Sequence, residues 1–206
     1  MKNWIINEKE TTNQYLIATQ KSIWISEQLK ELDINKLIHD KNLGKVKSLR
    51  YEEIKEIIFI DTDFSIEFVF KDSEVEKITY SINKSVFRQI KTYFKKHLSG
   101  IKIKDYSLLK QVLPQLTTLT LGLVFLSLTY STALDLENGL EIPESSKSSI
   151  IKKTILVLAE LVGASGSIIL GVIFSLIFIF LITKKLQNPK KGEVLKLDKT
   201  SKLKTA

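Results

Sequence analysis

Hydrophobic and polar residues are distributed very differently in two parts of the chain. Residues 1–113 mix charged and apolar positions, whereas residues 114–134 contain no charged side chain and residues 155–183 contain only Glu160. About 20 apolar residues in a helix cover the hydrocarbon core of a bilayer, so each apolar run can span one. The pattern predicts transmembrane helices at 114–134 and 154–183, joined by an extracytoplasmic loop at 135–153.

The second apolar run has a small residue at every fourth position. These residues are Ala159, Gly163, Ser167, Gly171 and Ser175. Small side chains leave a groove on one helix face, and another backbone can pack into that groove in lipid. The pattern predicts a helix-packing face and leaves three partners open: the first span of the same chain, a second copy in a homo-oligomer, or another membrane protein.

Glu160 lies beside the first of these small residues. If the helix leaves the hydrocarbon core at Thr183, about 20 residues back reaches Gly163 or Ala164, which leaves Glu160 about one turn outside. A tilted helix would draw the carboxylate inward, where a ring of Glu160 side chains in an oligomer could select cations. Glu160 is therefore expected to be either an interfacial residue or a pore residue.

The first apolar run is expected to begin at Pro114, because a first helical turn tolerates proline. The run is rich in serine and threonine, whose hydroxyls can bond to the backbone carbonyls of the preceding turn. These hydroxyls therefore require neither a pore nor a ligand.

Basic residues flank the two apolar runs. Residues 83–113 contain 8 Lys and Arg against 1 acidic residue, and the tail 184–206 contains 8 against 2. The positive-inside rule predicts that the N-terminal domain and this basic tail are cytoplasmic. Lys152 and Lys153 disagree with that orientation, but they can snorkel to the outer interface. The first ten residues include acidic side chains and no continuous apolar segment, so we expect no cleaved signal peptide and expect the first span to direct targeting.

Before the spans, apolar and polar residues mostly alternate, which predicts strands with one buried face. The alternation is clearest at 15–19, 23–25, 66–70 and 78–82. Turn-forming segments at 19–22, 61–63 and 72–74 separate the strands, and such close spacing predicts antiparallel hairpins. A helix follows, capped by Asn83 or Ser85 and ending at Gly100, with an apolar stripe of Val86, Ile90, Phe94 and Leu98.

This order of elements resembles a bacterial pleckstrin-homology-like (PH-like) or GRAM-like domain over about Asn13 to Leu98. The resemblance lies in YLIATQKSIWIS, RYEEIKEIIFID, SIEFVFKD, VEKITYSI and the helix SVFRQIKTYFKKHL. It implies an α+β fold in which a small antiparallel β-barrel with a C-terminal helix occupies residues 1–100. A basic juxtamembrane linker at 101–113 and an α-helical transmembrane hairpin would follow. The resemblance transfers no site residue, because the loop formed by Gln20, Lys21 and Ser22 is short and weakly charged.

The helix before the spans also carries a basic stripe. Lys84, Arg88, Lys91 and Lys95 are spaced four, three and four residues apart, so they share one helix face. Cations near a membrane anchor are attracted to anionic lipid by about 1 kcal/mol each. The stripe is therefore either a contact with anionic lipid of the inner leaflet or an ordinary solvated helix face.

The sequence contains little catalytic chemistry. It has no cysteine, its two histidines lie far apart, and it lacks the nucleotide-binding, serine-hydrolase and zinc-protease motifs. We expect no enzyme, no catalytic residue, no cofactor, no metal site and no nucleic-acid partner. The expected protein is a two-span adaptor or accessory subunit in a bacterial plasma membrane. The alternative is a small homo-oligomeric channel or membrane-perturbing effector assembled through the small residues of the second span.

Overall fold

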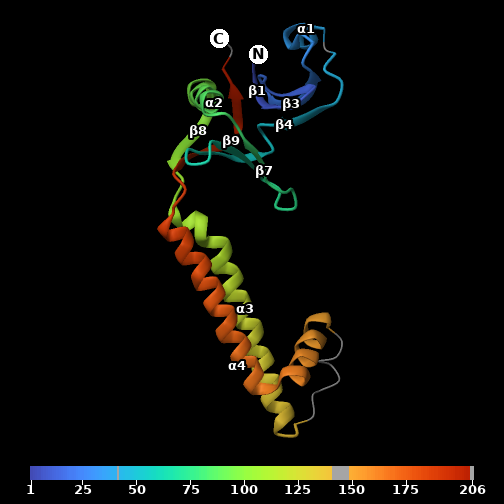
Figure 1. The fold of residues 1–206 in the computed structure, drawn as a ribbon, viewed down its shortest axis with the longest axis vertical. Coiled ribbons are helices and arrows are strands. Elements are labelled where there is room, and N and C mark those ends of the chain that lie inside the picture. Colours follow the sequence, from blue (N-terminus) through green and yellow to red (C-terminus); the bar gives the residue numbers. More distant parts are fainter. Residues whose placement is uncertain (41, 141–148, 205–206) are drawn as a thin grey trace. The chain divides into compact units, whose positions relative to one another are not determined.

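The computed structural model describes residues 1–40, 42–140 and 149–204, and the chain forms two compact units (Figure 1). The first, here termed the β unit, combines Met1–Tyr106 with Lys190–Ala206. The second, here termed the hairpin unit, is Ser107–Pro189. The β unit is therefore discontinuous in sequence, because the whole hairpin unit is inserted into it.

The N-terminal half of the β unit is a four-stranded antiparallel sheet in the order β1-β2-β3-β4. Its strands are β1 (Lys2–Glu8), β2 (Thr12–Ala18), β3 (Ser22–Leu29) and β4 (Val46–Arg50). A short helix, α1 (Ile34–His39), lies between β3 and β4, and the Asp33 side chain caps its N-terminus. The turn predicted at 19–22 joins β2 to β3, where the Thr19 hydroxyl donates to the carbonyl of Ser22.

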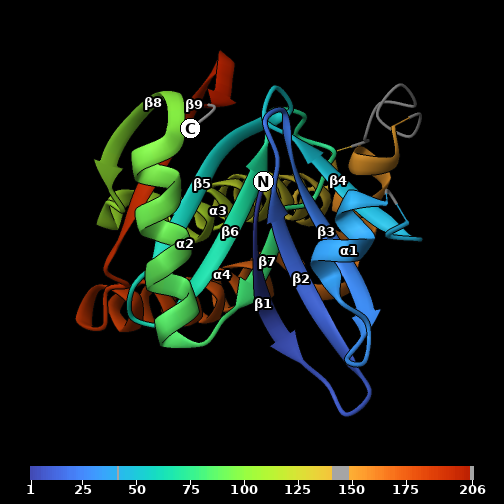
Figure 2. The same ribbon diagram turned by 90° about the horizontal axis from the view of Figure 1, so that it is seen from above.

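The second antiparallel sheet has five strands in the order β7-β6-β5-β9-β8. They are β5 (Ile54–Ile60), β6 (Ser65–Phe70), β7 (Ile78–Ser81), β8 (Leu98–Asp105) and β9 (Gly192–Leu203). The turns predicted at 61–63 and 72–74 lie between these strands in chain order, after β5 and β6. The sheets include a curled half-barrel, seen from above in Figure 2.

Helix α2 (Lys84–His97) packs against this curved surface. The Asn83 side chain accepts a hydrogen bond from the Ser85 backbone, so the cap predicted from sequence is confirmed. The helix ends at His97 and not at Gly100, because the chain becomes extended at Leu98 and enters β8. Phe87, Ile90 and Phe94 point into the core from its buried face.

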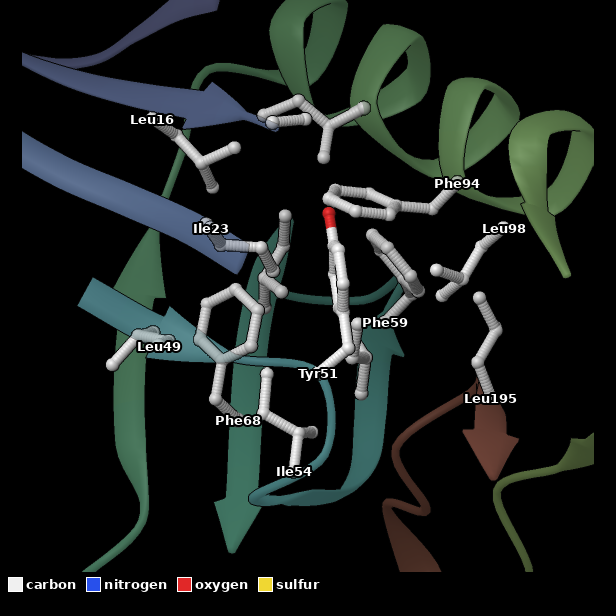
Figure 3. Packing of buried hydrophobic residues seen from close by; sticks show 14 of the residues in the cluster. Leu16, Ile23, Leu49, Tyr51, Ile54, Phe59, Phe68, Phe94, Leu98 and Leu195 are labelled. Carbon is white, nitrogen blue, oxygen red and sulfur yellow. The ribbon is translucent and has the colours of Figure 1, made fainter. Parts of the chain in front are cut away.

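One hydrophobic core joins both sheets and α2. It includes Leu16 and Ile23 from the first sheet, Phe59 and Phe68 from the second, and Phe94 from α2. Figure 3 shows Tyr51, which follows β4, in the middle of these side chains. Tyr51 is fully buried, and its hydroxyl donates to the carbonyl of Thr19 at 3.3 Å. Burial raises the pKa of this phenol well above its usual value.

Two segments differ from the sequence prediction. Residues 98–105, expected mainly as part of a linker, form β8, and residues 192–203, expected within a basic tail, form β9. Both segments alternate apolar residues with lysine, and the buried side chains of β9 include Leu195 and Leu197, which join the core. Lys102, Lys104, Lys196 and Lys202 of these strands are exposed. A count of charge therefore makes the two segments look like polar linkers and hides the strands.

Strand β9 is an interior strand of the second sheet, since it pairs with β5 on one side and with β8 on the other. The pairing with β5 requires a glycine at its first residue. A Cβ on Gly192 would lie 2.1 Å from the carbonyl oxygen of Phe59, which is closer than any real contact. The residues after the apolar runs are thus an integral part of the β unit.

The hairpin unit consists of α3 (Leu108–Glu137) and α4 (Ile150–Gln187), packed against each other. Both helices are long and apolar enough to cross a membrane by length and composition. Both also extend beyond the ranges predicted from the apolar runs. Pro114 lies inside α3 and not in its first turn, because Ser107 caps the helix seven residues earlier.

The predicted loop at 135–153 is shorter in the structure, since its first residues belong to α3 and its last residues belong to α4. Residues 141–148, which include the predicted loop charges Glu141, Glu144 and Lys147, lie outside the described residues.

Candidate functional site

The basic stripe of α2 is divided by the structure into paired and unpaired cations. The Lys91 ammonium lies 2.7 Å from an Asp61 carboxylate oxygen and 3.1 Å from a Glu193 oxygen. Lys95 lies 2.7 Å from the other oxygen of Glu193. Glu193 belongs to β9, so two of the four predicted lipid-contact residues, Lys91 and Lys95, attach α2 to the strand that follows the hairpin unit.

These ion pairs change the titration of Glu193. Its partial burial would by itself raise the pKa, but the ammonium groups of Lys95 and Lys91 outweigh that effect and hold the pKa below its ordinary value of 4.5. A carboxylate whose pKa is lower in the folded state contributes stability above the unfolded pKa. That contribution is lost as the pH falls through the folded pKa.

Replacing Lys91 by Gln is expected to destabilise the β unit by about 1–2 kcal/mol at neutral pH, since Asp61 and Glu193 lose a charged partner. The measurement is chemical unfolding of the solubilised full chain followed by tryptophan fluorescence. Both tryptophans, Trp4 and Trp24, lie in the β unit. The difference from the unmodified chain should shrink as the pH falls through the lowered pKa of Glu193, where this carboxylate becomes protonated.

Arg88 provides the matched control, because it is exposed on the same helix. Arg88→Gln should change the unfolding free energy by less than about 0.5 kcal/mol. Equal effects of the two substitutions, or a Lys91→Gln effect that is independent of pH, would contradict the assigned role of Lys91.

The unpaired cations of α2 face a different part of the β unit. Arg88 lines an open groove of about 450 Å³ together with Lys96, His97 and Lys2 of β1, and Trp4 and Tyr93 form its apolar wall. Within the described part of the chain, no carboxylate lines this groove. The fourth predicted residue, Lys84, lies apart from it, with its ammonium 5.6 Å from the centre of the Phe64 ring.

Sequence reasoning missed Lys2 as a member of this cationic groove. The segment 2–8 was not recognised as a strand, so nothing placed its lysine beside α2. The alternation of Trp4 and Ile6, both buried, with Asn3 and Ile5 is the signal that could have found β1.

The small residues of the second apolar run do not lie on one continuous helix. Gly163 has φ of 67° and ψ of −178°, which interrupts α4 and which non-glycine residues rarely adopt. Ala159 and Ser167, on either side of the break, are both buried. Gly171 is different, because a Cβ added there would meet nothing within 4 Å. The five residues therefore have different surroundings, and the buried ones are used within the hairpin unit.

Glu137, from the last turn of α3, stabilises the break in α4. Its carboxylate accepts a hydrogen bond of 2.9 Å from the backbone N–H of Ala164, the first residue after the break. A carboxylate at this position caps the free N–H groups of a helix and complements its dipole. The same oxygen lies 3.2 Å from the place where a Cβ of Gly163 would be. Residues 164–187 thus begin as a helix of their own.

Glu160 is exposed and belongs to the helical segment before the break. It therefore precedes the helix of 164–187 and is not part of it. Several hydroxyls of the first apolar run behave as expected from the sequence. Thr118, Thr120, Thr129 and Thr132 each donate to the carbonyl four residues earlier, at 2.9–3.0 Å.

The described residues hold no cluster of three or more His, Asp and Glu side chains that could bind a metal ion. His39 and His97 lie on different helices, and His39 contacts the adjacent Asp40 at 3.1 Å. No protein-family model, curated protein or solved structure matches this chain. Functional inference therefore depends on the charge, packing and connectivity of its own residues.

Proposed function

We propose that this chain is a non-catalytic, two-span protein of a bacterial plasma membrane that displays its β unit at the inner leaflet as an adaptor or accessory subunit. The observation that carries the proposal is the insertion of the hairpin unit between β8 and β9, which are neighbours in one sheet. A hairpin that leaves and re-enters the same folded unit has both outer ends on one side of the bilayer. The lysine-rich flanks favour the cytoplasmic side.

The order of strands also supports a PH-like barrel as the finer description of the β unit. A four-stranded meander, a three-stranded meander and then a helix that packs into the core are the elements that the resemblance implies. Strands β8 and β9 are additions to that plan. They extend the second sheet at β5 and connect it to both ends of the hairpin.

Topology mapping with a tag at each end of the full chain tests the proposal. In sealed spheroplasts, tags at both termini should be protected from external protease and become accessible only after lysis. A tag in the 141–148 segment should be accessible from outside. Tags on opposite faces, or a chain that stays monodisperse in buffer without detergent, would contradict the proposal.

The mass of the native complex in mild detergent separates the adaptor from its alternative. An adaptor should be recovered as a single hairpin or with a different protein. A homo-oligomer that conducts ions in liposomes would instead support a channel or membrane-perturbing effector.

The cations that remain unpaired on α2 are the proposed contact with anionic lipid. The double substitution Arg88→Glu and Lys96→Glu should reduce retention of phosphatidylglycerol on the solubilised chain at least tenfold, because about 1 kcal/mol is lost for each of the two cations removed. Native mass spectrometry with added lipid measures the retention. Lys202→Glu in β9 is the control for general charge, and an equal loss in that variant would contradict a specific contact.

A further inference from the structure

The first part of α4 differs from the rest of the helix in direction and in surroundings. Residues 150–162 end at the break at Gly163, and Figure 1 shows this orange segment turning aside from the long part of α4. Glu137 caps the helix that starts at Ala164. The two parts of α4 are therefore separate helices joined by one glycine.

Residues 150–162 present an exposed apolar stripe. Ile150, Val157 and Leu161 are 83%, 62% and 79% exposed. Their spacing of seven and four residues places them on one side of the helix. Ile155 and Ala159, on another side, are buried. The stripe is thus an apolar surface of this helix that the described residues leave uncovered.

The charged residues of the same helix lie on a different arc. Lys152, Lys153 and Glu160 are exposed, and at 100° per residue they share an arc of about 100° that adjoins the apolar stripe on the side of Val157. A short helix with an apolar stripe, a buried side and a charged arc is the pattern of a helix that lies in a membrane interface.

The length of the following helix agrees with that location. From Ala164 to Thr183 the chain is uncharged, and about 20 helical residues cover the roughly 30 Å hydrocarbon core. The break at Gly163 then falls at the outer boundary of the core, where a change of helix direction leads into the headgroup region. The stripe of Ile150, Val157 and Leu161 is too small to form a stable protein interface by itself, because such an interface buries about 800 Å² per partner. Lipid is therefore the better-matched occupant.

We propose that residues 150–162 form an interfacial helix of the outer leaflet. Ile150, Val157 and Leu161 insert among the upper acyl chains, and Lys152, Lys153 and Glu160 face the headgroups and water. The occupant of the apolar stripe is lipid of the bilayer that α3 and the rest of α4 cross. This inference rests on the proposed function, because it requires a spanning hairpin.

Single-cysteine labelling of the full chain tests this placement, since the chain has no cysteine of its own. Lys152→Cys, Val157→Cys and Leu161→Cys are reconstituted into nanodiscs together with Ile169→Cys, which lies in the long part of α4. A membrane-impermeant maleimide should label Val157→Cys and Leu161→Cys at least ten times more slowly than Lys152→Cys. A thiol-linked fluorophore, attached before reconstitution, should be quenched by brominated acyl chains at Val157 and Leu161 but not at Lys152.

The controls separate failure of the inference from failure of the proposed function. Equal labelling of Val157→Cys and Lys152→Cys, with Ile169→Cys protected, would overturn the interfacial helix and leave the spanning hairpin intact. Rapid labelling of Ile169→Cys would overturn the spanning hairpin itself. Protection of Val157→Cys without quenching by brominated lipid would mean that protein, such as a second copy, covers the stripe, and would also overturn the inference.

Discussion

Removing residues 190–206 is expected to unfold the β unit. Strand β9 is hydrogen-bonded to β5 and β8, and Val194, Leu195, Leu197 and Leu203 are all buried. Full burial of such side chains contributes about 1.5–3 kcal/mol each. Their combined loss is comparable to the about 5–15 kcal/mol by which a whole domain is stable. A merely solvated basic tail would be dispensable.

Tryptophan emission and limited proteolysis of the truncated chain in mild detergent measure this effect. Trp4 is 6% exposed, so unfolding should shift its emission to the red, and the β unit should become protease-sensitive. A matched pair of point variants avoids truncation. Leu195→Asp should unfold the β unit as well, whereas Lys202→Asp should not, because Lys202 is the exposed penultimate residue of β9. A truncated chain with native emission and protease resistance would contradict the role of β9.

The elements that the sequence predicted well are those with local signals. Helix α2 is an example, because its apolar stripe and its Asn83 cap lie within one short segment, although the helix ends at His97 and not at the predicted Gly100. The hairpins around 19–22 and 61–63 are similar, since a turn and the two strands that it joins are neighbours in the chain. Such features need no information about distant residues.

The elements that the sequence did not predict depend on distant pairing. Strand β9 finds its partners β5 and β8 across the entire hairpin unit, and its lysines resemble a membrane flank. The ion pairs of Lys91 and Lys95 also depend on the position of β9 in the second sheet, because their shared partner Glu193 lies on this strand. Without the position of Glu193, the sequence could not show which cations of the basic stripe on α2 form ion pairs.

Gly163 illustrates how one residue type can have two structural meanings. In sequence it continues a series of small residues, and a small residue in a membrane helix usually indicates close packing. In the structure its positive φ makes it the break between two helices. The carboxylate of Glu137, 26 positions before Gly163, stabilises this break, because it accepts a hydrogen bond from the N–H of Ala164 at the start of the helix of residues 164–187. The sequence around Gly163 contains no sign of this distant partner.

Replacing Gly122 of α3 by Leu is expected to force the two long helices of the hairpin unit apart. A Cβ at Gly122 would lie 2.4 Å from two atoms of the Phe174 ring in α4. That ring also contacts the Phe178 ring, with 4.6 Å between ring centroids and 41° between the ring planes, so its displacement would disturb a second side chain of α4. Overpacking of this kind typically costs about 1–3 kcal/mol or more.

Gly171→Leu in α4 is the matched control, because the added side chain meets nothing within 4 Å. Spin labels on cysteines at Leu121 and Ile173, both exposed, report the distance between α3 and α4 in reconstituted protein. Gly122→Leu should lengthen and broaden this distance distribution, and Gly171→Leu should leave it unchanged.

The same pair of variants separates packing within one chain from self-association. If the small residues of α4 instead join two copies, Gly171→Leu should lower the mass of the detergent-solubilised complex while Gly122→Leu leaves the α3–α4 distance intact. That outcome would contradict an intramolecular hairpin held together at Gly122.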